Sequence, residues 1–212
     1  MKNRQVYVPT EEEFQAGLRA YAQNESRGPV YFVALQQLAR CGGEAQAMAN
    51  TIWILLKSWH KQFYQFGKPD LSALAKCVED HRPMLQALRG RAIDTLCYED
   101  EDVIKDLFYA FTTATRRHNT RGAQESTVAT AKALHLLAPG FLPLWDNRIA
   151  WHYGEGPMMI RNYLTFCWQM KELANAVSCY VNKSDDRTLL KRLDEFNYSA
   201  YTKFWIKVGS AT

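Results

Sequence analysis

Residues 125–151 read ESTVATAKALHLLAPGFLPLWDNRIAW and predict two helices joined by an apolar loop. The first part of this stretch, residues 126–137, has apolar residues at helical spacing and predicts a helix that begins at a serine N-cap. Pro139-Gly140 ends that helix, because proline and glycine interrupt helices, and an apolar loop follows. Asp146 ends the loop and begins the next helical stretch. This reversal of the chain can bring Lys132, on the first helix, and Asp146 to one cleft.

The composition is that of a folded protein with a large core. The chain has 212 residues, of which 47% are hydrophobic and 23% charged. This length suits one well-buried domain or two intimately packed helical lobes, so we expect residues 1–212 to form a single compact domain. No apolar run is long enough to cross a membrane, and no apolar signal segment follows the first residues. We therefore expect a cytoplasmic protein that needs no membrane and no obligate protein partner.

The cysteines and histidines show no pattern typical of a metal or cofactor site. The five cysteines are scattered, and no two of them form a Cys-x-x-Cys pair, which argues for reduced thiols. The five histidines lack the spacing found in metalloenzymes. We expect no metal and no cofactor. The net charge of +4 is compatible with a nucleic-acid partner without demonstrating one.

Helical signals dominate the rest of the chain and predict an all-α fold of about ten helices. Thr10, with Glu13 three positions later, predicts a capping box at the start of the first helix. Asp70 can cap a short helix, and Ser184 or Asp185 can cap the last one. The helix at 43–61 is long and apolar, and we expect it to be the central buried helix. The expected helices cover residues 11–24, 29–40, 43–61, 82–96, 101–118, 126–137, 146–153, 157–181 and 185–204.

The segment around Asp146 resembles the helix-hairpin-helix DNA glycosylase superfamily, particularly small bacterial proteins that look like 8-oxoguanine glycosylases. In that superfamily a helix follows the hairpin, and a loop then ends in an essential aspartate that caps another helix. Residues 126–137, the loop to Trp145 and the segment 146–149 match these elements. Weaker similarity extends over residues 55–59 and 194–198. The resemblance implies a helix-hairpin-helix glycosylase fold and a catalytic role for Asp146.

Two positions depart from the superfamily pattern. The glycine-rich hairpin sequence is reduced to Gly122-Ala123, so we expect a hairpin of altered geometry. The lysine that forms a Schiff base in bifunctional relatives would stand at Thr127 or Val128. Lys132 lies one helical turn later, which moves its amine by about 5.4 Å along the helix axis. Lys132 is therefore a secondary catalytic candidate, and a lyase activity is left open.

The chemistry of base removal accounts for the residue types. Cleavage of an N-glycosidic bond develops positive charge on the sugar, which a fixed carboxylate can stabilise, or the carboxylate can activate the attacking water. The base must first leave the duplex and enter a pocket, while other groups hold the phosphates. The candidate pocket residues are Trp145, Asn147, Trp59, Phe63 and Tyr64. The candidate phosphate contacts are Arg116, Arg117, Arg121, Ser126 and Thr127.

The sequence thus predicts a DNA glycosylase that acts on a modified base in double-stranded DNA and leaves an abasic site. A relative in the small bacterial group excises glucosylated hydroxymethylcytosine from viral DNA, and this antiviral activity competes with 8-oxoguanine repair as the expectation. Plainer interpretations stay open. Asp146 can be a helix cap and nothing more, Lys132 and the arginines can be solvated surface residues, and the aromatic residues can belong to the core. These interpretations together describe a non-catalytic helical module that binds DNA or protein. A helical ribonuclease is a third class, but its Arg–His pair has no convincing counterpart.

Overall fold

The computed structural model describes residues 6–120, 122–154, 159–181 and 186–209. Across these ranges it contains eleven α-helices and one two-stranded sheet, which confirms the all-α class expected from the sequence. Buried side chains from all eleven α-helices belong to one connected hydrophobic cluster. None of the described helices has the length and apolar character needed to span a membrane.

The first helices begin at the residues that the capping signals predict. The hydroxyl of Thr10 accepts a hydrogen bond from the Glu13 amide, and the Glu13 carboxylate accepts one from the Thr10 amide, which confirms the capping box. The carboxylate of Asp70 caps α5 by accepting from the amides of Ser72 and Ala73. The helices of this part are α1 (Glu11–Asn24), α2 (Gly28–Arg40), α3 (Ala45–Trp59), α4 (Lys61–Tyr64) and α5 (Leu71–Asp80).

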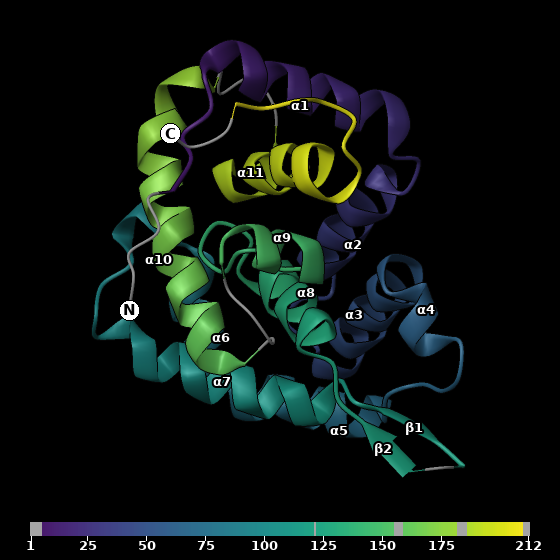
Figure 1. The fold of residues 1–212 in the computed structure, drawn as a ribbon. Helices are drawn as coiled ribbons and strands as arrows, with labels where there is room; N and C mark the ends of the chain where they lie inside the picture. Colours follow the sequence, from purple (N-terminus) through teal and green to yellow (C-terminus); the bar gives the residue numbers. More distant parts are fainter. Residues whose placement is uncertain (1–5, 121, 155–158, 182–185, 210–212) are drawn as a thin grey trace.

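The middle of the chain differs from the prediction at two places. The helix predicted at 82–96 stops early, because Gly90 ends it and a separate 3-10 turn follows. The helix predicted at 101–118 ends at Ala114, and residues 117–119 and 122–124 pair as two antiparallel strands that project from the helical body (Figure 1). The elements are α6 (Arg82–Arg89), η1 (Ile93–Thr95), α7 (Asp100–Ala114), β1 (Arg117–Asn119) and β2 (Gly122–Gln124). At Gly122-Ala123, where an altered hairpin was expected from the resemblance, the structure has strand β2, paired with β1.

The last third contains the helix, loop and helix around Asp146. Ser126 caps α8 and Asp146 caps α9, as predicted. The last helix begins after Thr188, and the predicted caps Ser184 and Asp185 lie outside the described residues. The elements are α8 (Thr127–Leu137), α9 (Asn147–His152), α10 (Ile160–Val177), η2 (Ser178–Tyr180), α11 (Leu189–Asn197) and the π-helix η3 (Tyr198–Thr202).

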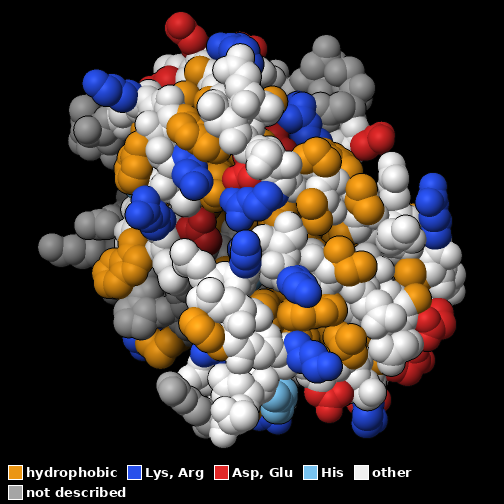
Figure 2. All heavy atoms as spheres, turned by 90° about the vertical axis from the view of Figure 1, so that its right-hand side faces the viewer, with side chains coloured by type: hydrophobic (Ala, Val, Ile, Leu, Met, Phe, Trp, Pro, Cys, Tyr) orange, Lys and Arg blue, Asp and Glu red, His pale blue; other side chains and the backbone are white. Residues whose placement is uncertain are grey.

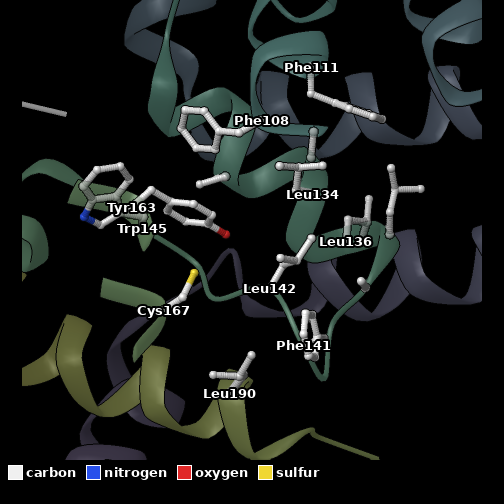
Figure 3. Close-up of a cluster of buried hydrophobic side chains, with 14 of the residues drawn as sticks. Phe108, Phe111, Leu134, Leu136, Phe141, Leu142, Trp145, Tyr163, Cys167 and Leu190 are labelled. Atoms are coloured by element: carbon white, nitrogen blue, oxygen red, sulfur yellow. The ribbon is translucent and has the colours of Figure 1, made fainter. Parts of the chain in front are cut away.

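The central helix is α8. Figure 1 shows it in the middle of the molecule, with α3, α7, α10 and α11 around it. Nine of its eleven residues are buried, and such a helix, apolar all round, must be covered on every side. In Figure 3 its Leu134 and Leu136 lie among aromatic and aliphatic side chains of the surrounding elements. The expectation that the helix at 43–61 is central is wrong, because α3 buries one face and leaves Ile54 58% exposed.

The loop that joins α8 to α9 is part of the core. Phe141 and Leu142 are fully buried, and the guanidinium carbon of Arg91 lies 4.4 Å from the centre of the Phe141 ring. Gly140 passes close to another backbone: a Cβ at this position would lie 2.7 Å from the carbonyl oxygen of Arg91. A loop packed in this way holds Asp146, at its end, in a defined position.

We predict that Gly140→Ala lowers the free energy of unfolding by about 1–3 kcal/mol, because the added methyl group meets a backbone carbonyl that cannot move aside easily. Urea unfolding measures the change. Gly90→Ala is the matched control, since a Cβ there has no neighbour within 4 Å and the backbone is right-handed. Its effect should stay within about 0.5 kcal/mol. Equal stability of the two variants would contradict the close packing of the loop.

Candidate active site

One cavity brings the two predicted catalytic residues together. Its volume is about 210 Å³, and it lies between the connection of α1 to α2, the end of α3, α8, the start of α9 and the segment from α11 to η3. Lys132 and Asp146 both line it, as do the predicted pocket residues Trp59 and Trp145. The remaining lining residues, which the sequence analysis did not select, are Tyr21, Glu25, Arg27, Leu144, Asp194, Tyr198 and Thr202.

Two hydrogen bonds hold the Asp146 carboxylate. Its Oδ1 accepts from the Ile149 amide at 2.9 Å, which is the N-cap contact of α9. Its Oδ2 accepts from the Thr202 hydroxyl at 3.1 Å. The side chain is half-buried at the cavity. Because each oxygen has one fixed donor, the carboxylate has a defined orientation and keeps lone pairs for a further contact.

The donor to Asp146 comes from the π-helix η3. This element continues α11 with wider turns, and π-helical turns occur frequently at functional sites. Its last residue, Thr202, donates its hydroxyl to Asp146 and accepts a hydrogen bond from Arg148 Nη1 at its carbonyl oxygen, at 2.8 Å. Its first residue, Tyr198, lines the same cavity. The irregular turn therefore positions two cavity residues, and the prediction of a regular helix to residue 204 missed it.

Lys132 reaches the cavity from the first turns of α8. Its Nζ donates to the carbonyl oxygen of Trp59, the last residue of α3, at 2.7 Å. Burial lowers the pKa of Lys132 to about 8, although the negative charges of Asp146 and Asp194 partly oppose that shift. A lysine with such a pKa is uncharged in a larger fraction of molecules near neutral pH than an ordinary lysine is. The geometry thus supplies an amine that can accept a proton or attack as a nucleophile.

A second lysine lies against the cavity lining and is completely buried. Lys191 Nζ lies 4.5 Å from the centre of the Tyr21 ring and 5.1 Å from that of Trp59. It also donates to Asp194 Oδ2 at 2.8 Å. Burial alone would lower the pKa of Lys191, but Asp194, Tyr21 and Glu195 raise it above the ordinary value. This lysine therefore stays charged and fixes the aromatic rings and Asp194 around it.

Charged side chains also fix the positions of residues at the rim of the cavity. The Arg27 guanidinium donates to both oxygens of Glu25, at 2.8 and 2.6 Å, and to the Tyr198 hydroxyl at 2.8 Å. These hydrogen bonds from Arg27 lower the pKa of Glu25 to about 2 despite partial burial. Glu25 and Arg27 are neighbours in the loop after α1, and local sequence carries no signal that distinguishes them from a solvated pair. Their place at the cavity comes from the packing of α1 against α11.

The other predicted pocket residues do not line this cavity. Tyr64 is buried and donates its hydroxyl to the Thr115 carbonyl at 2.5 Å, which makes it a core residue. Phe63 stacks on His60, and Asn147 is exposed beside the N-cap of α9. Trp145 lines the cavity, but it is only 1% exposed and packs against Phe166.

The predicted phosphate contacts gather around the β-hairpin and the start of α8. Arg117 is engaged within the protein, since its guanidinium stacks on Phe63 and donates to the Phe63 carbonyl and the Gln124 side chain. Ser126 is also engaged, as its hydroxyl caps α8 and contacts His60 Nε2 at 2.9 Å. Arg116 and Thr127 are partly exposed, and Arg121 lies outside the described residues.

We predict that the pKa values of Lys132 and Lys191 differ widely. Lys132 should titrate near pH 8 and Lys191 above the range of ordinary lysines. Heteronuclear NMR of the lysine side-chain signals measures both, with K132R used for assignment. Between pH 8 and the ordinary lysine range the unfolded state binds more protons at this residue, so Lys132 makes the free energy of unfolding rise with pH there. Titration of Lys132 together with the exposed lysines would contradict its burial at the cavity.

No protein-family model, curated protein or solved structure matches this chain. In the part of the chain that the structure describes, no group of three or more His, Cys, Asp or Glu side chains could hold a metal ion. The resemblance to helix-hairpin-helix DNA glycosylases therefore remains a prediction.

Proposed function

We propose that this protein is a DNA glycosylase that receives a modified base, turned out of the duplex, and cleaves its N-glycosidic bond. One observation carries the proposal: a fixed carboxylate, Asp146, and a lysine of lowered pKa, Lys132, line the same aromatic cavity. The cavity of about 210 Å³ is smaller than the roughly 300–1,000 Å³ typical of sites for drug-sized ligands. Its size and its aromatic rings suit a single base and its sugar.

In the proposed reaction Asp146 acts at the sugar. The bond from C1′ to the base breaks, the base leaves with the electron pair, and positive charge develops on the sugar. The carboxylate stabilises that charge, because its position is fixed before the reaction by Ile149 and Thr202. A water oxygen then bonds to C1′ and passes a proton to Asp146, while the departing base takes up a proton from solvent. The DNA is left with an abasic site.

The uncharged amine of Lys132 offers a second route. Its nitrogen would bond to C1′ as the bond to the base breaks, and one of its protons would pass to the departing base. Transfer of the second nitrogen proton to the ring oxygen, as the bond from C1′ to that oxygen breaks, would open the sugar and leave an imine. The lowered pKa of Lys132 supports this route, since the amine must lose its proton before it attacks. The hydrogen bond to the Trp59 carbonyl must break for the amine to reach the sugar.

The surface around the cavity supports a DNA partner. The connection of α1 to α2, α4 and the turn after α11 lie on the right-hand side of Figure 1, the side that Figure 2 faces. Lys and Arg side chains spread over the middle of this face with hydrophobic side chains between them, and most Asp and Glu side chains lie near its edges (Figure 2). Such a distribution favours contact with phosphates around a partly apolar pocket.

We predict that Asp146→Asn lowers base release by roughly 10²–10³-fold or more, because the carboxylate that stabilises the sugar charge is lost. Asparagine caps helices about as well as aspartate, so the free energy of unfolding should change little. The substrates are duplexes with 8-oxoguanine and phage DNAs with hydroxymethylated or glucosylated cytosine. Mass spectrometry measures the released base. Strand cleavage at abasic sites measures the amount of abasic DNA, which is the other product.

The matched control is Asp70→Asn. Asp70 caps α5 in the same way as Asp146 caps α9, and it does not line the cavity. Its substitution should leave base release unchanged. Full activity of the D146N variant would contradict the assigned mechanism. If the wild-type protein releases no base from any of these DNAs but still binds them, the alternative of a non-catalytic DNA-binding module is correct.

A separate prediction concerns Lys132. Reduction with borohydride during the reaction should trap a covalent protein–DNA adduct, detected by gel electrophoresis, if the amine forms an imine. Lys132→Gln should abolish the adduct, whereas Lys76→Gln, at an exposed lysine of α5, should not. Base release without any adduct in the wild-type protein would exclude the imine route and leave water as the nucleophile.

A further inference from the structure

Phe204 combines backbone strain with exposure. Its φ is 55°, and it is the one non-glycine residue with a positive φ among the described residues. That region is unfavourable for a bulky side chain. The ring is also 70% exposed to solvent. Strained conformations persist only where the surrounding structure imposes them, and they cluster at functional sites.

The turn around Phe204 is pinned on both sides. The Lys203 amide donates to the Tyr198 carbonyl at 2.9 Å, and the Trp205 amide donates to the Ser199 carbonyl at 2.8 Å. The Trp205 ring also meets the Tyr198 ring edge-on, with the centres 5.8 Å apart. Because both neighbours are tied to the π-helix η3, the backbone of Phe204 cannot relax. Its ring therefore projects from a fixed turn.

This turn directly follows the lining of the cavity. Tyr198 and Thr202 line it, and Phe204 comes two residues after Thr202. Two exposed cations accompany the turn. Arg148 donates to the Thr202 carbonyl at 2.8 Å, and Lys203 Nζ lies 5.7 Å from the centre of the Tyr198 ring. An exposed aromatic ring two residues from the cavity lining, on a turn accompanied by two cations, matches the surface of a nucleic acid, where base stacks lie between phosphates.

We propose that Phe204 enters the base stack of duplex DNA at the gap left by the nucleotide that turns into the cavity. This inference rests on the proposed function and adds a positioning residue to it. Proteins that kink or open a duplex insert apolar side chains, phenylalanine among them, between bases. Filling the gap offsets part of the unstacking cost and keeps the nucleotide outside the helix. A ring on a pinned turn loses little conformational freedom when it inserts.

The first test needs no chemical step. The probe is a duplex with a tetrahydrofuran abasic-site analogue, opposite which 2-aminopurine is placed. Insertion of Phe204 should push the 2-aminopurine out of the stack and raise its fluorescence several-fold when the wild-type protein binds. Phe204→Ala should still bind, as measured by anisotropy, because the cations remain, but it should lose the fluorescence rise. Tyr109→Ala, at an aromatic residue on α7 that is 60% exposed, should behave as the wild type does.

The second test compares base release from duplex and from single-stranded DNA that carry the same target base. Phe204→Ala should slow release from the duplex by about 10–100-fold and change release from the single strand less than about threefold, since a single strand has no stack to fill. Phe204→Trp should retain release from the duplex. Phe204→Gly should raise the urea midpoint, because glycine tolerates a positive φ, and it should share the loss of duplex activity.

The outcomes separate this inference from the proposed function. A fluorescence rise that needs Phe204, without release of any base, would leave the insertion correct and overturn the glycosylase reaction. Base release with equal fluorescence and equal duplex rates for wild type and F204A would overturn the insertion alone. An equal loss of activity on duplex and single strand would also overturn it, because Phe204 would then act in the cavity. Absence of duplex binding by the wild-type protein would overturn both.

Discussion

The burial of α8 on every side is the constraint on which the site depends. An apolar helix of this kind requires other elements around it, and the structure supplies them from both halves of the chain. Lys132 is the one half-buried residue of α8 after its first position, so its amine emerges where the covering elements leave a cavity. The loop that follows α8 packs into the core through Phe141 and Leu142, and Asp146, at the end of this loop, lines the same cavity.

The charged side chains at the cavity are buried together with partners, because burying a single unpaired charge is unfavourable. Lys191 is fully buried, and Asp194 and the aromatic rings of Tyr21 and Trp59 compensate its charge. Lys132 donates to a carbonyl and has no carboxylate in hydrogen-bonding contact within the described part of the chain, so burial lowers its pKa and favours its neutral form. Two lysines near one cavity thus have opposite roles: one is a permanent cation that fixes the lining, and the other is an amine that can exchange a proton.

The parts of the fold that local sequence determines could be predicted, and those that packing determines could not. The caps at Thr10, Ser126 and Asp146 depend on residues three positions apart, so their helices were predicted correctly. The sequence around Lys191, Asp194 and Glu195 looks like ion pairs on a solvated helix face. Its burial follows from α1, α2 and α3, which lie far away in sequence. The π-helix and the strain at Phe204 likewise result from tertiary contacts. A hairpin was expected at Gly122-Ala123, but the two short strands that pair there were not, because their sequence lacks the alternation of apolar and polar residues typical of strands.

The central claim is that the cavity between Asp146 and Lys132 receives a nucleotide from duplex DNA. A crystal structure of the D146N variant with a duplex that carries a tetrahydrofuran abasic-site analogue tests it most directly. The account predicts that the analogue lies outside the helix, with its sugar against residue 146 and near the Lys132 amine. An analogue that stays within the helix, or a duplex bound at a surface away from an empty cavity, would contradict the account.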